Sequence, residues 1–141
     1  MKGYLLDTNY VSELVRIRPE PRVMSWIEAT EDTLLYLSVL TLGEIRKGIA
    51  LLPRSSKRQE LERWLEIKLP TQFGNRILAI NGPIADLWGL MTAQTKQKGI
   101  TLPMVDGLIA ATAIHHKLML VTRNIKDFAV WNVPLLNPWE D

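Results

Sequence analysis

Four carboxylates in this sequence occupy positions where a negative charge is costly. Asp7 ends a short apolar run, Glu44 interrupts LTLGEIRKGI, Asp106 interrupts PMVDGLIAATAI, and Asp127 lies shortly after the apolar run LMLVT. A carboxylate near a protein core loses hydration free energy unless it is paired, hydrogen-bonded or bound to a metal. Four such acids at one place would repel each other, and a hard cation that prefers oxygen ligands, Mg²⁺ or Mn²⁺, would neutralise them.

Each acid also has a purely structural interpretation. Asp7 could cap the helix that follows it, and the helix dipole would favour Asp106 in the first turn of its helix. Glu44 could pair with Lys47, and Asp127 could cap the short segment after its strand. A functional site is distinguished from four separate structural roles only if the fold brings the acids together.

The elements that carry the acids alternate between strands and helices. Short apolar runs predict buried strands, and apolar residues spaced three and four apart predict helices between them. We expect strands over residues 4–6, 34–39, 76–80 and 118–122, and an edge strand over 133–136. We expect a first helix that begins at residue 8 and ends before Pro19 and Pro21. Further helices are expected over 23–27, 42–52, 61–69 and from 84 to near Gly99. The next helix begins at Pro103 and runs through a largely apolar segment, and residues 124–128 are expected to form a loop or short helix.

This alternation predicts an α/β protein with a parallel sheet and helices on both of its faces, in one domain spanning residues 1–141. Ligands of such sheets bind outside the carboxyl ends of the strands. Asp7 and Asp127 follow two predicted strand ends, and Asp106 opens a buried helix. We therefore expect the acids to converge at this edge of the sheet.

Composition excludes several classes of function. The 141 residues contain no cysteine, which rules out disulfides, zinc–thiolate sites, iron–sulfur clusters and thiol nucleophiles and favours a reducing compartment. No apolar run approaches the roughly 20 residues that a membrane span needs, so we expect a cytoplasmic protein without a membrane segment. The formal net charge of +2 does not by itself indicate nucleic-acid binding.

Local charge is more informative than net charge. Between Ile45 and Lys68 there are seven basic residues against three acidic ones. This excess begins directly after Glu44, where it could draw phosphates toward the acids. The segment is the candidate RNA-contacting surface, with Arg46, Lys47 and Arg54 as its leading residues.

Five ordered blocks of the chain resemble a known family. They are LLDTN at 5–9, LTLGEIRKGI at 40–49, LPMVDGLIAATA at 102–113, LVTRNIKDF at 120–128 and LLNPWE at 135–140. Together they resemble PIN-domain ribonucleases, specifically VapC toxins of the FitB-like kind. The resemblance implies a three-layer α/β/α sandwich, RNA cleavage with Mg²⁺ or Mn²⁺, a cognate VapB-like antitoxin whose tail lies in a groove near the acids, and a homodimer.

The resemblance also assigns the site residues. Asp7, Glu44 and Asp106 match the acidic centre of the family, and Asp127 is the expected fourth acid. Many PIN domains place an acid directly in the strand-end motif, where this chain has Asn124. The fourth position is therefore open between Asp127 as an acid and Asn124 as a neutral or water-mediated ligand.

Three further polar residues are expected to support the acids. We expect Thr8 and Asn9 chiefly to cap the first helix, and also to orient Asp7 or metal-bound water. Thr122 resembles the hydroxyl that the family places at the edge of the site.

The predicted reaction is metal-assisted hydrolysis of an RNA phosphodiester. Asp7 and Asp106 would hold the principal metal ion, while Glu44 and Asp127 would hold a second ion or position the attacking water. A phosphatase with Asp7 as nucleophile would, by its usual pattern, have a second aspartate where this chain has Asn9. A non-catalytic RNA- or partner-binding module would keep the basic segment and lose the acids, but all four acids are present.

Overall fold

Five parallel strands form one sheet in the computed structural model, which describes residues 3–140. The strand order is β3-β2-β1-β4-β5, so β1 lies at the centre. The strands are β1 (Tyr4–Leu6), β2 (Leu35–Ser38), β3 (Ile77–Leu78), β4 (Met119–Val121) and β5 (Leu135–Leu136). The predicted parallel sheet is confirmed, and every strand falls within its predicted segment.

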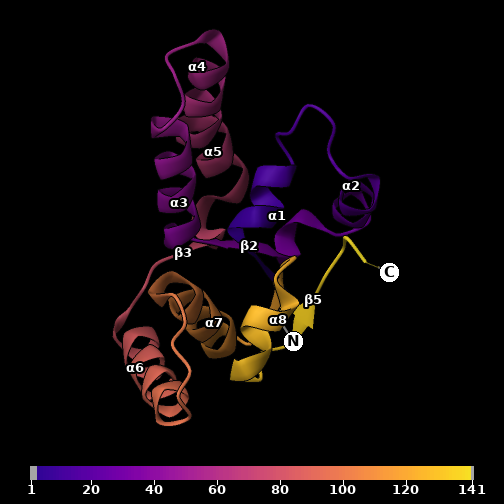
Figure 1. Ribbon diagram of the computed structural model, residues 1–141. Coiled ribbons are helices and arrows are strands. Elements are labelled where there is room, and N and C mark those ends of the chain that lie inside the picture. Colours follow the sequence, from indigo (N-terminus) through magenta and orange to yellow (C-terminus); the bar gives the residue numbers. More distant parts are fainter. Residues whose placement is uncertain (1–2, 141) are drawn as a thin grey trace.

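Helices connect the successive strands (Figure 1). Those between β1 and β3 are α1 (Thr8–Glu13), α2 (Pro21–Glu28), α3 (Val39–Ala50), α4 (Ser56–Arg63) and α5 (Leu69–Phe73). Those after β3 are α6 (Gly82–Gln97), α7 (Met104–His116) and α8 (Ile125–Phe128). A π-helical turn joins α4 to α5, and shorter 3₁₀ turns complete the chain; their bounds are Trp64–Lys68, Asp32–Leu34, Gly74–Arg76 and Ala129–Trp131.

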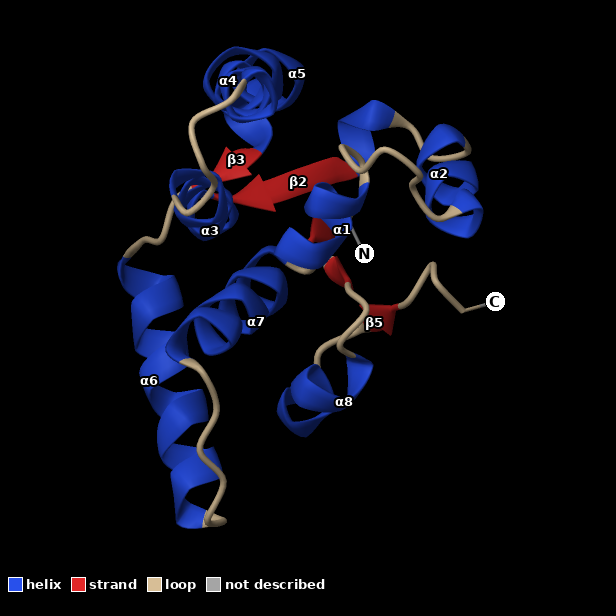
Figure 2. Cartoon of the chain, turned by 45° about the horizontal axis from the view of Figure 1, so that its top comes forward, coloured by secondary structure: helices blue, strands red, loops and turns tan. Residues whose placement is uncertain are grey.

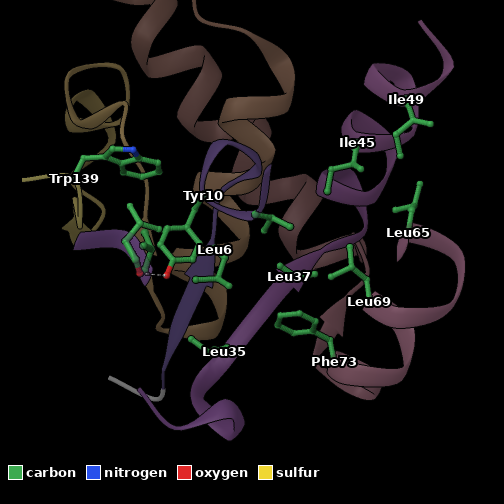
Figure 3. Packing of buried hydrophobic residues seen from close by; sticks show 13 residues of the cluster. Leu6, Tyr10, Leu35, Leu37, Ile45, Ile49, Leu65, Leu69, Phe73 and Trp139 are labelled. Carbon is green, nitrogen blue, oxygen red and sulfur yellow. Dashed lines mark hydrogen bonds between the residues drawn. The ribbon is translucent and has the colours of Figure 1, made fainter. Parts of the chain in front are cut away.

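Two hydrophobic clusters show that the molecule is a three-layer α/β/α sandwich. Successive strand residues point to opposite faces, so Leu6 packs in one cluster and Leu5 in the other. The first cluster joins the sheet to α1, α2, α3 and α5, and within it the Tyr10 hydroxyl donates to the Val23 carbonyl at 3.2 Å (Figure 3). The second cluster joins the sheet to α6, α7 and α8, which lie on the opposite side of the strands from α3, α4 and α5 (Figure 2).

The residue that caps α1 differs from the prediction. The N-cap is Asp7, whose extended backbone (φ −72°, ψ 159°) and side chain satisfy the helix start, so the prediction that Thr8 or Asn9 caps the helix was wrong. The helix ends at Glu13, before either proline. Pro21 instead lies in the first turn of α2, where its missing N–H costs no hydrogen bond.

The strand order places a topological switch point between β1 and β4. From β1 the chain adds β2 and β3 on one side, then returns to add β4 and β5 on the other. The crevice of such a sheet opens outside the carboxyl ends of the two strands at the switch point, here at Asp7 and Thr122. In the part of the chain that the structure describes, no helix is long and apolar enough to cross a membrane.

Candidate active site

Asp7 lies at the carboxyl end of the central strand, held by hydrogen bonds to its backbone and side chain. Its N–H donates to the Val121 carbonyl at 2.9 Å, which extends the pairing of β1 with β4. Its Oδ1 accepts from the Thr8 N–H at 2.8 Å, and its Oδ2 accepts from the Thr122 hydroxyl at 2.7 Å. Because Asp7 is only 5% exposed and both oxygens are engaged, the protein alone fixes this carboxylate in place.

Thr122 is the centre of the network that orients Asp7. Its hydroxyl donates to Asp7 and accepts from the Asn124 backbone N–H at 3.0 Å and from the Asn9 side-chain amide at 3.4 Å. Asn9 Oδ1 in turn accepts from the Arg123 N–H at 3.4 Å. A hydroxyl has one donor and two acceptor sites, so the buried Thr122 uses all of them. Asn9 therefore ties α1 to the end of β4 instead of capping the helix.

Glu44 faces the start of α1 from α3. Ser38, the last residue of β2, caps α3 by accepting from the Leu40 N–H at 3.1 Å. Ile45 of α3 is buried in the core, whereas the neighbouring Glu44 is exposed. The Thr8 hydroxyl donates to Glu44 Oε1 at 2.5 Å, which connects Glu44 to the residue next to Asp7.

Asp106 lies in the first turn of α7, where the helix dipole favours an acid. The next residue, Gly107, packs under the indole of Trp88 from α6. A Cβ at Gly107 would lie 2.9 Å from Trp88 Cδ1, so only glycine allows this close approach of the two helices. The packing positions the start of α7, and with it Asp106, against the core.

Asp127 and Asn124 line the same hollow after β4, a cavity of about 390 Å³ that they share with Arg123, Lys126 and Glu140. Asn124 is the N-cap residue of α8, but its side chain makes no capping hydrogen bond, and its link to Thr122 runs through the backbone. Asp127 lies in the first turn of α8, and its charge acts on Asp106. The structure thus places both candidates for the fourth position at one edge of the site.

The four acids influence each other electrostatically. Burial, together with the charges of Asp7, Glu44 and Asp127, raises the pKa of Asp106 to about 6. Burial also raises the pKa of Asp7; the hydrogen bonds from Thr122 and Thr8 oppose this rise, and the charge of Glu44 adds to it. Thr8 links Asp7 to Glu44 through hydrogen bonds, and the charges of Asp7, Glu44 and Asp127 all act on Asp106.

The protein supplies no cation to balance these charges: within residues 3–140, no lysine or arginine forms an ion pair with any of the four acids. In the same range, no three Asp, Glu or His side chains already form a ready ligand set for one metal ion. The donor set still fits Mg²⁺ or Mn²⁺, because it consists of carboxylate oxygens whose repulsion a divalent cation would offset. Glu44 and Asp127 are exposed, so their side chains can change rotamer toward such an ion.

A largely apolar cavity of about 620 Å³ adjoins the acids. Thr8, Glu44 and Lys47 lie on its polar side. Its apolar lining comes from α3, from the residue that follows α3 and from the start of α7, and includes Val39, Leu40, Leu51 and Val105. Leu51 is 76% exposed, so this cavity presents apolar surface to solvent within reach of Glu44.

The three predicted RNA-contacting residues have different surroundings. Arg46 is engaged in ion pairs, with Nη2 2.7 Å from Glu66 Oε1 and Nη1 3.9 Å from Glu62 Oε2. Lys47 lines the cavity beside Glu44. Arg54 lines a different hollow, of about 280 Å³, at the start of α4. Of the three, Lys47 is the one that shares a cavity with an acid of the site.

One buried acid was not expected from the sequence. Glu13, at the end of α1, is 3% exposed. Its Oε2 accepts from the Glu20 N–H at 3.2 Å, and its Oε1 lies 3.4 Å from both the Arg16 guanidinium and the Trp139 indole nitrogen. Glu13 thus fastens the α1–α2 connection to the C-terminal tail. No local sequence signal reveals this role, because Trp139 lies at the other end of the chain.

Comparison with known proteins agrees with this architecture. The family model described as "PIN domain" matches residues 4–130. The toxin FitB of Neisseria gonorrhoeae is 37% identical over 137 residues, covering 97% of this chain and 99% of that protein. VapC ribonuclease Y4jK of Sinorhizobium fredii is 35% identical over 136 residues, covering 96% and 97% of the two chains.

Solved structures match equally well. The crystal structure of FitAcB from Neisseria gonorrhoeae aligns with a TM-score of 0.92 and 36% identity, over 98% of this chain and 99% of that one. The structure of FitAB bound to an IR36 DNA fragment aligns with a TM-score of 0.91 and 35% identity, over 98% and 96%. The chain therefore belongs to the PIN-domain family, as a relative of toxin FitB and VapC ribonuclease Y4jK.

Proposed function

We propose that this protein is a Mg²⁺- or Mn²⁺-dependent endoribonuclease and the toxin of a toxin–antitoxin pair. The observation that carries the proposal is the group of four neighbouring carboxylates at the switch point of the sheet, with no basic partner among residues 3–140. The names of its relatives, a toxin and a VapC ribonuclease, give the same reaction class.

The four acids divide into two pairs in the proposed reaction. Asp7, whose two carboxylate oxygens accept hydrogen bonds, and Asp106, in the first turn of α7, would bind the principal cation. Glu44 and Asp127, which are exposed, would bind a second cation or accept a hydrogen bond from the attacking water. The cation, when bound, lowers the pKa of water and offsets the negative charge that develops on the phosphate.

Thr122 and Thr8 position the acids in this proposal. The Thr122 hydroxyl directs its proton at Asp7 Oδ2 and so keeps the carboxylate plane fixed. Thr8 engages Asp7 through its backbone N–H and Glu44 through its hydroxyl, which sets the spacing between two acids. Neither residue needs to touch the substrate for its loss to lower the rate.

An antitoxin tail is the proposed occupant of the apolar cavity beside Glu44. The cavity offers apolar contacts from Val39, Leu51 and Val105, and Glu44 also lines it. A segment seated there would cover Glu44 and block access of RNA. The solved FitAcB and VapBC2 assemblies, to which this chain is similar, support an antitoxin partner.

We also propose that the protein forms a homodimer and acts in the cytoplasm, where an RNA-cleaving toxin meets its substrate. Exposed apolar side chains outside the cavity, such as Leu90 on α6 and Ile100 after it, are 59% and 36% exposed and are available for a subunit contact. Analytical ultracentrifugation of the purified protein tests the dimer, because a single monomeric species would contradict it.

A non-catalytic module that only binds RNA or a partner is the alternative, and one experiment separates the two. The purified protein is incubated with a pool of total RNA in Mg²⁺, in Mn²⁺ and in EDTA, alongside Asp7→Asn and the matched control Asp86→Asn on the exposed face of α6. We expect cleavage with either metal, none in EDTA, about a 10³-fold loss in Asp7→Asn, and the parent rate in Asp86→Asn.

The Asp7→Asn protein should remain folded, since the amide keeps the shape of the side chain and relieves repulsion among the acids in metal-free buffer. Cleavage by Asp7→Asn at the parent rate would contradict the proposed function, and so would RNA binding by the parent protein with no cleavage in either metal.

A further inference from the structure

A second charged hollow lies at the far end of α1 from the acids. It is a groove of about 490 Å³ between the α1–α2 connection and α4, which lie on the same side of the sheet (Figure 1). Its charged lining residues are Arg16, Arg18 and Lys57, and no acid lines it. Because Arg16 and Arg18 are far from Lys57 in the sequence, no run of basic residues indicates this groove.

The positive charge of this groove is largely uncompensated. Within residues 3–140, Arg18 and Lys57 form no ion pair, and the Arg16 side chain contacts Glu13 at 3.4 Å while remaining 64% exposed. By contrast, Arg46 of the basic segment pairs with Glu62 and Glu66. Phosphates bind more strongly to cations whose charge no acid neutralises, so the groove is a better candidate for binding phosphates than Arg46.

The groove also offers apolar surface. Ile17 lies between the two arginines and is 89% exposed, more than any other large hydrophobic residue in the described part of the chain. Val15 and Leu61 add apolar surface to the lining. Arginine side chains suit single-stranded RNA, because they pair with its phosphates and their guanidinium planes stack on unstacked bases.

One face of α1 connects the groove to the acidic site. Thr8 lines the cavity beside Glu44, and Ser12 lines the basic groove. Residues four apart on a helix lie on the same face, with Cβ atoms about 5–6 Å apart. A strand of RNA whose phosphodiester lies at the acids therefore reaches the groove within one helical turn.

We propose that Arg16, Arg18 and Lys57 bind the phosphate backbone of the RNA strand next to the cleaved bond, along a path over Thr8 and Ser12. The inference rests on the proposed ribonuclease function and adds to it the route of the substrate. An acidic protein segment is the competing occupant. RNA is favoured because the groove lies one helical turn from the acids that would act on a phosphodiester.

The test compares two double variants that remove the same charge. Arg18→Ala/Lys57→Ala removes two cations from the groove, and Lys96→Ala/Lys98→Ala removes two exposed cations at the end of α6. Binding of a single-stranded RNA oligonucleotide is measured by fluorescence anisotropy in EDTA, where we expect no cleavage, at several salt concentrations. We expect weaker binding by the groove variant, with the slope of log K against log[salt] flatter by about 1.4, since each lost phosphate contact removes about 0.7.

The control variant should keep the parent affinity and slope, and Arg18→Lys/Lys57→Arg should restore both because it keeps the charge. In cleavage assays the groove variant should raise KM more than it lowers kcat on long RNA, and this defect should shrink on a dinucleotide, which is too short to reach the groove.

The possible outcomes separate this inference from the proposed function. If the parent protein cleaves RNA and the groove variant binds RNA like the control, the RNA path is wrong and the ribonuclease assignment stands. If the groove variant keeps RNA affinity but loses binding to a protein partner, the groove belongs to that partner and the inference is overturned. If the groove variant loses RNA binding while the parent cleaves nothing, the groove binds RNA, but the ribonuclease assignment and the path to a cleaved bond both fail.

Discussion

The buried and exposed acids of the site differ in how firmly the protein holds them. Asp7 is buried, and both of its carboxylate oxygens accept hydrogen bonds. Glu44 and Asp127 are exposed, and among residues 3–140 Glu44 accepts one side-chain hydrogen bond, from Thr8. The fold therefore fixes the buried half of the site, Asp7, without a bound ion. The positions of the exposed half, Glu44 and Asp127, depend on the cation that they would bind. Mutations in the exposed half should therefore lower activity alone, whereas mutations in the buried half should lower both activity and stability.

The exposed half is tested most strongly at the fourth position. We expect Asp127→Ala to lower ribonuclease turnover by about 10²-fold, because it removes a charge that would hold a second cation or the attacking water. Asn124→Ala is the matched change on the same cavity, and it should cost little, since its structural link runs through the backbone. Turnover that collapses in Asn124→Ala and survives in Asp127→Ala would reverse the assignment. Both variants should unfold at the parent's urea concentration.

The buried half is tested at Thr122. Thr122→Val keeps the shape but removes the hydroxyl that donates to Asp7 and accepts from the Asn124 N–H. We expect activity to fall by about 10- to 100-fold, and the free energy of unfolding to fall by about 1–3 kcal/mol because buried polar atoms lose partners. Thr122→Ser should recover both the activity, measured by RNA cleavage, and the free energy of unfolding, measured by urea denaturation. A valine variant with full activity would show that Asp7 is held without this hydroxyl.

Asp106 lies between the two halves and gives the smallest expected effect, on the pH dependence of stability. Its folded pKa of about 6 is above its ordinary value of 3.8, so the folded state binds this proton more tightly than the unfolded state. In EDTA, the free energy of unfolding should therefore fall as pH rises from about 4 to above 6. Asp106→Asn should flatten this fall, and added Mg²⁺ should raise the stability of the parent near pH 7. Urea denaturation across this pH range measures the slope, and an equal slope in Asp106→Asn would contradict the assignment.

The sequence predicts the architecture well because its signals are local. The apolar runs LLYLSV and LMLVT each contain a strand, and the apolar helix after Pro103 is buried as expected. Asp7 shows the limit of such signals: its two interpretations, helix cap and site acid, are not exclusive, since it caps α1 and also lies among the other acids.

Features that depend on distant segments could not be predicted. The burial of Glu13 requires Trp139, and the groove of Arg16, Arg18 and Lys57 forms only when α4 folds beside the α1–α2 connection. The ion pairs of Arg46 with Glu62 and Glu66 likewise join two helical segments. Each of these depends on tertiary contacts that leave no periodic pattern in the chain.

Anomalous scattering from crystals soaked in Mn²⁺ tests the central claim most directly. We expect a peak within bonding distance of Asp7 and Asp106, with Glu44 or Asp127 turned toward it or toward a second peak. The peak should vanish in Asp7→Asn and persist in Asp86→Asn. A fully soaked crystal with no peak at the carboxyl ends of β1 and β4, or with the same peak in Asp7→Asn, would contradict the proposal that these four acids form a metal centre.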